Sequence, residues 1–226
     1  MREYTELLRQ MVRAQPGGSV HFEGQIHRMQ WAPRVQPVRA GIPVWLAAIS
    51  PKMVRVAASV ADGIAMGVLL SPEYVRDAIR PVAAAAAAAA DRDPDALQFP
   101  MGGLVAVDDD LNRARATVKA TICSFFDPVP HPYYEFLLRE QGFSAAADAC
   151  LKWVPQGRTQ TAIDHIDDAV ADRLAFVGTP EQCARRLDAY QGVIDEVIFL
   201  NAGGGDARTA CEAHRPVMAI KRAAGG

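Results

Sequence analysis

The stretch from Gly41 to Gly67 constrains the fold most, because two strand signals and a helix signal follow one another in it without interruption. It reads GIPVWLAAISPKMVRVAASVADGIAMG. The apolar run from Val44 to Ala48 lies between turn residues and has the length of a strand buried on both faces. The segment Gly63 to Gly67 has the same character. A strand, a helix and a second strand within about 25 residues predict a right-handed βαβ unit.

Serine or threonine followed by proline marks the start of three predicted helices, at Ser50, Ser71 and Thr179. A hydroxyl at the N-cap accepts a hydrogen bond from a free backbone N–H, and the proline after it has no N–H to leave unpaired. Gln182 follows Thr179 at the spacing of a capping box. Pro81 predicts a kink or a new start in the helix after Ser71. We expect the three capped helices on the outer face of a parallel sheet.

Residues 1–40 predict a helix and a hairpin that lead into the central unit. An amphipathic helix over residues 2–13 is indicated by one apolar face, made of Tyr4, Leu7, Leu8, Met11 and Val12. Residues 21–29 are typical of a short hairpin that turns near Glu23 and Gly24. His21 and His27 would then be cross-strand neighbours, which leaves a metal site open as the alternative to a solvated hairpin.

Two further strands are predicted, at 102–107 and 196–200, and they join those at 43–48 and 63–67 to give about four parallel strands. Three aspartates, Asp108 to Asp110, follow the third strand. They either form a divalent-metal cluster or cap the helix that starts at Leu111, and we favour capping because carboxylates stabilise a helix N-terminus. Residues 127–172 show helical patterns without a strand signal, and a last helix is expected over about 207–221.

Composition excludes several classes of function. Lys plus Arg is 24 against 26 for Asp plus Glu, so the chain lacks the basic footprint of a nucleic-acid-binding protein. No apolar run reaches the roughly 18 residues of a membrane span. The four cysteines, Cys123, Cys150, Cys183 and Cys211, form no CxxC pair, which is typical of free thiols in a reducing cytoplasm.

Three segments together resemble the bacterial luciferase-like monooxygenase family, whose members are flavin- or coenzyme F-420-dependent oxidoreductases built on a TIM barrel. They are PVWLAAISPKMVRVAASVADGIAMG at 43–67, FVGTPEQCARRLDAY at 176–190 and GVIDEVIFLNAGG at 192–204. The resemblance implies an α/β fold in which the chain forms the C-terminal half of a (β/α)8 barrel. Barrel strands five to eight would lie within 41–226, with a long helical excursion at about 127–175. Residues 1–226 would be a single domain that lacks the family's N-terminal half.

The turn after the first strand of the central unit is the best candidate for a ligand site. Ligands of parallel barrels bind at the carboxyl ends of the strands. Here that end leads into a helix N-terminus, whose N–H groups and positive potential suit a phosphate. Small residues at 47 and 48 let a ligand approach the main chain. An ordinary capped βα turn without a ligand is the alternative.

The resemblance implies that this turn and the end of the next strand hold the phosphate and tail of the cofactor, which is coenzyme F-420 (a deazaflavin) or FMN. Ile49 or Ser50 takes the place of the family's usual glycine in the turn. The cofactor-binding candidates are Ala47, Ala48, Ile49, Ser50, Lys52, Met66 and Gly67.

No pattern in the sequence identifies a catalytic acid, base or metal site. His131 lies in a loop rich in proline and aromatic residues and His165 in a polar helical segment, and both are typical of surface positions. The resemblance implies hydride transfer or monooxygenation of a small organic substrate, with the hard chemistry supplied by the cofactor. The alternative is a non-catalytic half-barrel, or a subunit completed by another chain. We expect a truncated cytoplasmic protein that forms a homodimer or pairs with a partner chain.

Overall fold

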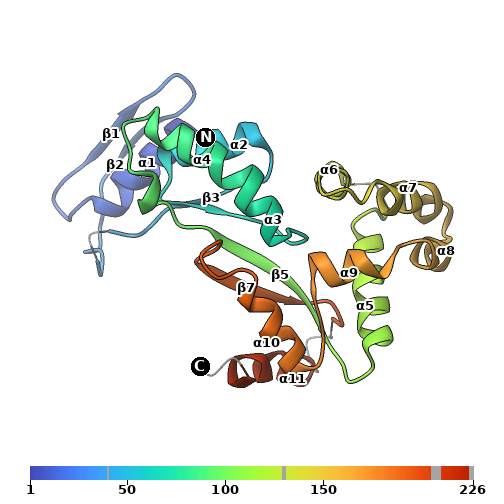
Figure 1. Cartoon of the computed structure of the whole chain (residues 1–226). Helices are drawn as coiled ribbons and strands as arrows, with labels where there is room; N and C mark the ends of the chain where they lie inside the picture. Colours follow the sequence, from blue (N-terminus) through green and yellow to red (C-terminus); the bar gives the residue numbers. More distant parts are fainter. Residues whose placement is uncertain (40, 129–130, 205–209, 224–226) are drawn as a thin grey trace. The chain divides into compact units, whose positions relative to one another are not determined.

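A computed structural model describes residues 1–39, 41–128, 131–204 and 210–223. It shows two compact units (Figure 1). The first comprises Met1–Ala65 and Ile79–Phe99, and the second comprises Met66–Ala78 and Pro100–Gly226. Within the described ranges, no helix combines the length and the apolar character that a membrane crossing requires.

The first unit contains an antiparallel hairpin, a parallel strand pair and helices. Its elements are α1 (Arg2–Arg13), β1 (Val20–Glu23), β2 (Arg28–Trp31), β3 (Trp45–Ala47), α2 (Pro51–Val60), β4 (Gly63–Ala65), α4 (Arg80–Ala88) and the 3₁₀ turn Pro94–Ala96.

The predicted hairpin is confirmed, but its two histidines are not cross-strand neighbours. His21 pairs with Gln30, whereas His27 lies in the turn before β2. The Glu3 carboxylate on α1 accepts hydrogen bonds from the backbone N–H groups of Gln25, Ile26 and His27, at 2.9 to 3.1 Å. This carboxylate therefore fixes the turn that contains His27.

The predicted βαβ unit is confirmed, with shorter strands than expected. β3 and β4 are parallel, and Leu46 is the register partner of Ile64. Helix α2 packs against α4 through small residues on both helices, because Ala57, Ala58, Ala83 and Ala87 are fully buried. Alanine leaves room for two helix backbones to approach closely. The expected interruption near Pro81 is a π-helix, Val75–Ile79, after which α4 begins at Arg80.

The second unit is built around a parallel sheet in the order β6-β5-β7. Its elements are α3 (Pro72–Tyr74), β5 (Pro100–Val107), α5 (Leu111–Ser124), α6 (Pro132–Glu140), α7 (Ser144–Trp153), the 3₁₀ turn Val154–Gln156, α8 (Thr159–Asp164), α9 (Asp168–Leu174), β6 (Phe176–Gly178), α10 (Pro180–Asp188), β7 (Glu196–Asn201) and α11 (Ala210–Ala223).

Strand β5 occupies the centre of this sheet. It pairs with β7 from Pro100 to Val105 and with β6 from Val105 to Val107, and Figure 1 shows β5 alongside β7. β6 was not among the four predicted strands. The parallel strands confirm the α/β class, and in the described part of the chain they form separate sheets and no closed barrel.

Helices α5 to α9 enclose the main hydrophobic core of the second unit. Asp110 caps α5 by accepting from Asn112 and Arg113, which confirms the capping role predicted for this aspartate. The core includes Leu104 of β5, Ile122 of α5 and Leu174 of α9. The thiols of Cys123 on α5 and Cys150 on α7 are buried in it, with their sulfur atoms 3.9 Å apart.

The segment that follows β4 is anchored by hydrogen bonds from two distant side chains. Gln141 donates to the Leu69 carbonyl and accepts from the Ser71 N–H, both at 2.8 Å. The buried hydroxyl of Tyr190 donates to the Leu70 carbonyl at 2.8 Å. These contacts fix the chain between Met66 and the capped start of α3 at Ser71.

We expect Tyr190→Phe to lower the free energy of unfolding by about 1 to 3 kcal/mol, because the buried Leu70 carbonyl loses its partner. Urea unfolding followed by circular dichroism measures the change. Tyr133→Phe is the matched control, since that side chain is 50% exposed. Equal stability of the two variants would contradict the anchoring role of Tyr190.

Candidate functional site

The turn from β3 into α2 contains five of the seven predicted cofactor-binding residues, namely Ala47, Ala48, Ile49, Ser50 and Lys52. Ala47 ends β3 with an exposed side chain, whereas Ala48 is buried and donates its N–H to the Ala65 carbonyl at 3.2 Å. Ser50 is the N-cap of α2, and its hydroxyl lies 3.5 Å from the Met53 nitrogen. The expected cap followed by proline is thus present at the carboxyl end of a parallel strand.

The charge of this turn suits an anion. The first N–H groups of a helix have no acceptor within the helix, and the helix dipole adds positive potential there. Lys52 is exposed and, among the described residues, has no ion-pair partner. No acidic residue lies in the first turn of α2. The donors present, backbone N–H groups, a hydroxyl and an ammonium, therefore fit the phosphate of FMN or of coenzyme F-420.

Asp62 holds the two ends of the βαβ unit together. Its carboxylate accepts from the Val44 N–H at 2.8 Å, just before β3, and forms an ion pair with Arg9 on α1. Burial acts to raise the pKa of Asp62, but the hydrogen bonds from Arg9 and Val44 outweigh it and the pKa is lowered. Sequence reasoning missed this residue because its partners are distant along the chain.

Met66 and Gly67, the remaining candidates, belong to the second unit. Met66 is buried, and its backbone is hydrogen-bonded to β5. Its N–H donates to the Pro100 carbonyl, and its carbonyl accepts from the Gly102 N–H. Gly67 is exposed, and a Cβ added there would meet no atom within 4 Å. Close packing therefore does not require glycine at position 67.

The loops at the carboxyl edge of the β6-β5-β7 sheet are tied to one another. The Asp108 N–H donates to the Gly178 carbonyl at 3.0 Å, and the Arg113 guanidinium lowers the pKa of the Asp108 carboxyl. After β7, the Ala202 N–H donates to Val105 and its carbonyl accepts from Thr121. Hydrogen bonds therefore connect the loops at this edge of the sheet.

The two histidines considered from the sequence lie on the surface, as expected. His131 precedes α6 and its ring contacts Tyr133 and Tyr134. His165 follows α8 with its Nδ1 2.7 Å from the Thr161 carbonyl. Neither histidine lies in a turn that follows a parallel strand.

A family model described as luciferase-like monooxygenase matches residues 1–196. The chain belongs to this family. A 5,10-methylenetetrahydromethanopterin reductase of Archaeoglobus fulgidus is 25% identical over 191 residues, which cover 83% of this chain and 55% of the relative. An F420-dependent glucose-6-phosphate dehydrogenase of Nocardia farcinica is 26% identical over 208 residues, covering 84% of this chain and 58% of the relative.

Solved structures show the same fold. The coenzyme F420-dependent tetrahydromethanopterin reductase of Methanopyrus kandleri superposes with a TM-score of 0.73 at 20% identity, over 96% of this chain and 61% of that one. An EDTA monooxygenase from Chelativorans gives a TM-score of 0.55 at 15% identity, over 98% of this chain and 58% of that one. This member of the luciferase-like family thus spans little more than half the length of these relatives.

We expect Asp62→Asn to destabilise the protein by about 1 kcal/mol at neutral pH, a small value because the carboxylate is partly exposed and screened. A lowered pKa stabilises the fold above the unfolded-state value of 3.8, and that contribution is lost as the pH falls through the folded-state pKa. The difference between wild type and variant should therefore shrink below about pH 4.

Urea midpoints measured from pH 3 to pH 7 test this expectation. Asp95→Asn, at an exposed position of the same unit, serves as the control. A difference between wild type and Asp62→Asn that does not change with pH would show that the Asp62 charge has no part in stability.

Proposed function

We propose that this chain binds FMN or coenzyme F-420 as part of an oxidoreductase or monooxygenase that acts on a small organic substrate. The main support for this proposal is that the N-terminus of α2 follows the carboxyl end of β3 in a chain of the luciferase-like family. A relative named as a reductase, a relative named as an F420-dependent dehydrogenase and a structure named as a monooxygenase support both reaction types.

The chain's own residues would bind and orient the cofactor. The hydroxyl of Ser50, the nearby N–H groups and the Lys52 ammonium are proposed to hold its phosphate. Ala47 and Ile49, the other candidates of this turn whose side chains are not buried, would lie beside it. When bound, the cofactor would supply hydride or activate oxygen. Met66 and Gly67 stay predictions from the sequence.

We further propose that β3, β4, β5 and β7 correspond to barrel strands five to eight, with 131–175 as the helical excursion. The chain would then correspond to the C-terminal half of the family's barrel. The exposed side chains of Ile198 and Leu200 on β7, 57% and 50% accessible, support this assignment, because β7 is an edge strand of its sheet. A closed barrel has no such edge.

The same edge keeps a second candidate function open, namely a non-catalytic half-barrel or a subunit completed by another chain. An unpaired strand edge with apolar side chains favours association. We therefore propose a homodimer, or a complex with a partner chain, located in the cytoplasm. In both cases the partner would contribute a strand that pairs with the free edge of β7.

We expect Ser50→Asp to weaken the binding of FMN or coenzyme F-420 at least tenfold, because a carboxylate would then face the phosphate. Ser50→Asn is the matched control: asparagine and aspartate cap helices about equally well and have similar shapes, but asparagine is neutral. Titration followed by cofactor fluorescence measures both. Equal affinities of the two variants would place the phosphate elsewhere.

Sedimentation velocity of the purified chain should show a dimer or a larger species. Leu200→Lys should shift it toward the monomer, since a lysine on an edge strand opposes pairing. Met218→Lys is the control, because Met218 is an exposed apolar residue that lies on α11 and not on β7. A monomeric wild-type chain that binds either cofactor tightly would refute the half-barrel assignment.

A further inference from the structure

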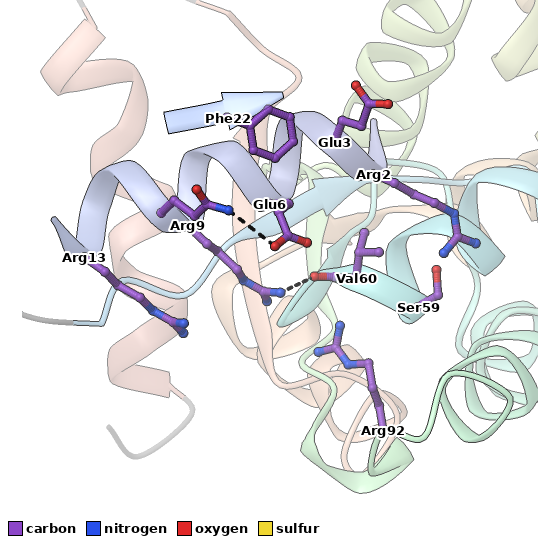
Figure 2. Close-up of a pocket in the computed structure, with 10 residues that line it drawn as sticks. Arg2, Glu3, Glu6, Arg9, Arg13, Phe22, Ser59, Val60 and Arg92 are labelled. Atoms are coloured by element: carbon purple, nitrogen blue, oxygen red, sulfur yellow. Dashed lines mark hydrogen bonds between the residues drawn. The ribbon is translucent and has the colours of Figure 1, made fainter. Parts of the chain in front are cut away.

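A pocket of about 640 Å³ lies in the first unit, at the opposite end of α2 from Ser50. It is lined by Arg2, Glu3, Glu6, Arg9, Gln10 and Arg13 of α1, Phe22 of β1, Ser59 and Val60 of α2, and Arg92. Figure 2 shows Arg2, Arg9 and Arg13 reaching into it from α1, and Arg92 facing them from below. Its volume lies in the range of small-molecule sites.

The acidic side chains of the pocket are already engaged. The Glu3 carboxylate accepts three backbone hydrogen bonds from the hairpin turn, which lower its pKa. Glu6 accepts from Gln10 at 3.5 Å. Neither carboxylate forms an ion pair with an arginine of the pocket within the described part of the chain.

Two of the four arginines have structural partners. Arg9 donates to the Val60 carbonyl and pairs with Asp62, while Arg92 donates to the Ala61 carbonyl and lies 3.9 Å from the same Asp62. Burial lowers the pKa of Arg92, and repulsion from Arg9 lowers it further. One carboxylate thus serves two guanidinium groups that repel each other.

The guanidinium groups of the other two arginines, Arg2 and Arg13, form no hydrogen bond or ion pair with any described residue. They lie at the two ends of α1, about 16 Å apart along the helix axis. With Glu6 and Arg9 between them they follow the spacing of one helix face. The pocket is therefore elongated, with an unpaired cation at each end and two crowded cations between them.

We propose that this pocket binds an organic oxyanion of at least two negative charges, a phosphate ester or a polycarboxylate. Guanidinium groups pair with both through two parallel N–H···O bonds, and this recognition is stronger than that between neutral groups. An anion beside Arg9 and Arg92 would relieve their mutual repulsion. The site is separate from the turn at Ser50, because α2 places about 15 Å between its two ends.

Isothermal titration of the full chain with pyrophosphate and with citrate tests the proposal, against sodium chloride of matched ionic strength. We expect saturable binding of at least one of the two anions. The double variant Arg2→Gln, Arg13→Gln should weaken it about tenfold or more. Stronger binding of pyrophosphate would assign the site to phosphate esters, and stronger binding of citrate would assign it to polycarboxylates.

Arg55→Gln is the matched control, because Arg55 is an exposed arginine of α2 outside the pocket. Ser50→Asp separates the two sites: it should leave this binding unchanged even where it abolishes cofactor binding. An absence of saturable binding would overturn the proposal. So would an equal loss in Arg55→Gln, or a loss in Ser50→Asp without one in the double variant.

Discussion

The second unit depends on the requirement that buried backbone groups be hydrogen-bonded. Strand β5 meets it on both edges: β7 pairs along one, and β6 and Met66 pair along the other. Gly103 shows how tightly this strand is enclosed, because a Cβ there would lie 2.9 Å from side-chain atoms of Phe176 and Val197. Glycine at position 103 therefore allows side chains of the two neighbouring strands to pack directly against β5.

Helix starts were the part of the fold most readily predicted from the sequence. The N-caps at Ser50, Ser71 and Thr179 are all present, and Gln182 completes the capping box. Capping is a local interaction between residues two or three positions apart, so adjacent residues contain the whole signal. The candidate phosphate turn was predictable for the same reason, since it is one of these starts.

Interactions between distant residues were not predictable in this way. β6 is three residues long, too short for an apolar period to emerge, and its pairing with β5 defines it. Asp62 meets Arg9, 53 residues away, and no periodicity links them. The pairing of Met66 with Met101 of β5 was not predictable either, and the expected contact of Met66 with a cofactor stays a prediction. Strand partners and ion pairs between distant residues can be identified only once the chain has folded.

The distribution of cysteines has a consequence for how the two units can be followed separately. All four cysteines of the sequence belong to the second unit, and the first unit contains none. Cys123, Cys150 and Cys183 are fully enclosed, and the first two touch across α5 and α7. A thiol reagent can reach them after local opening of the surrounding helices, and amide and thiol protection both report such openings. The rates of sulfhydryl labelling therefore report local opening of the second unit and carry no information on the first.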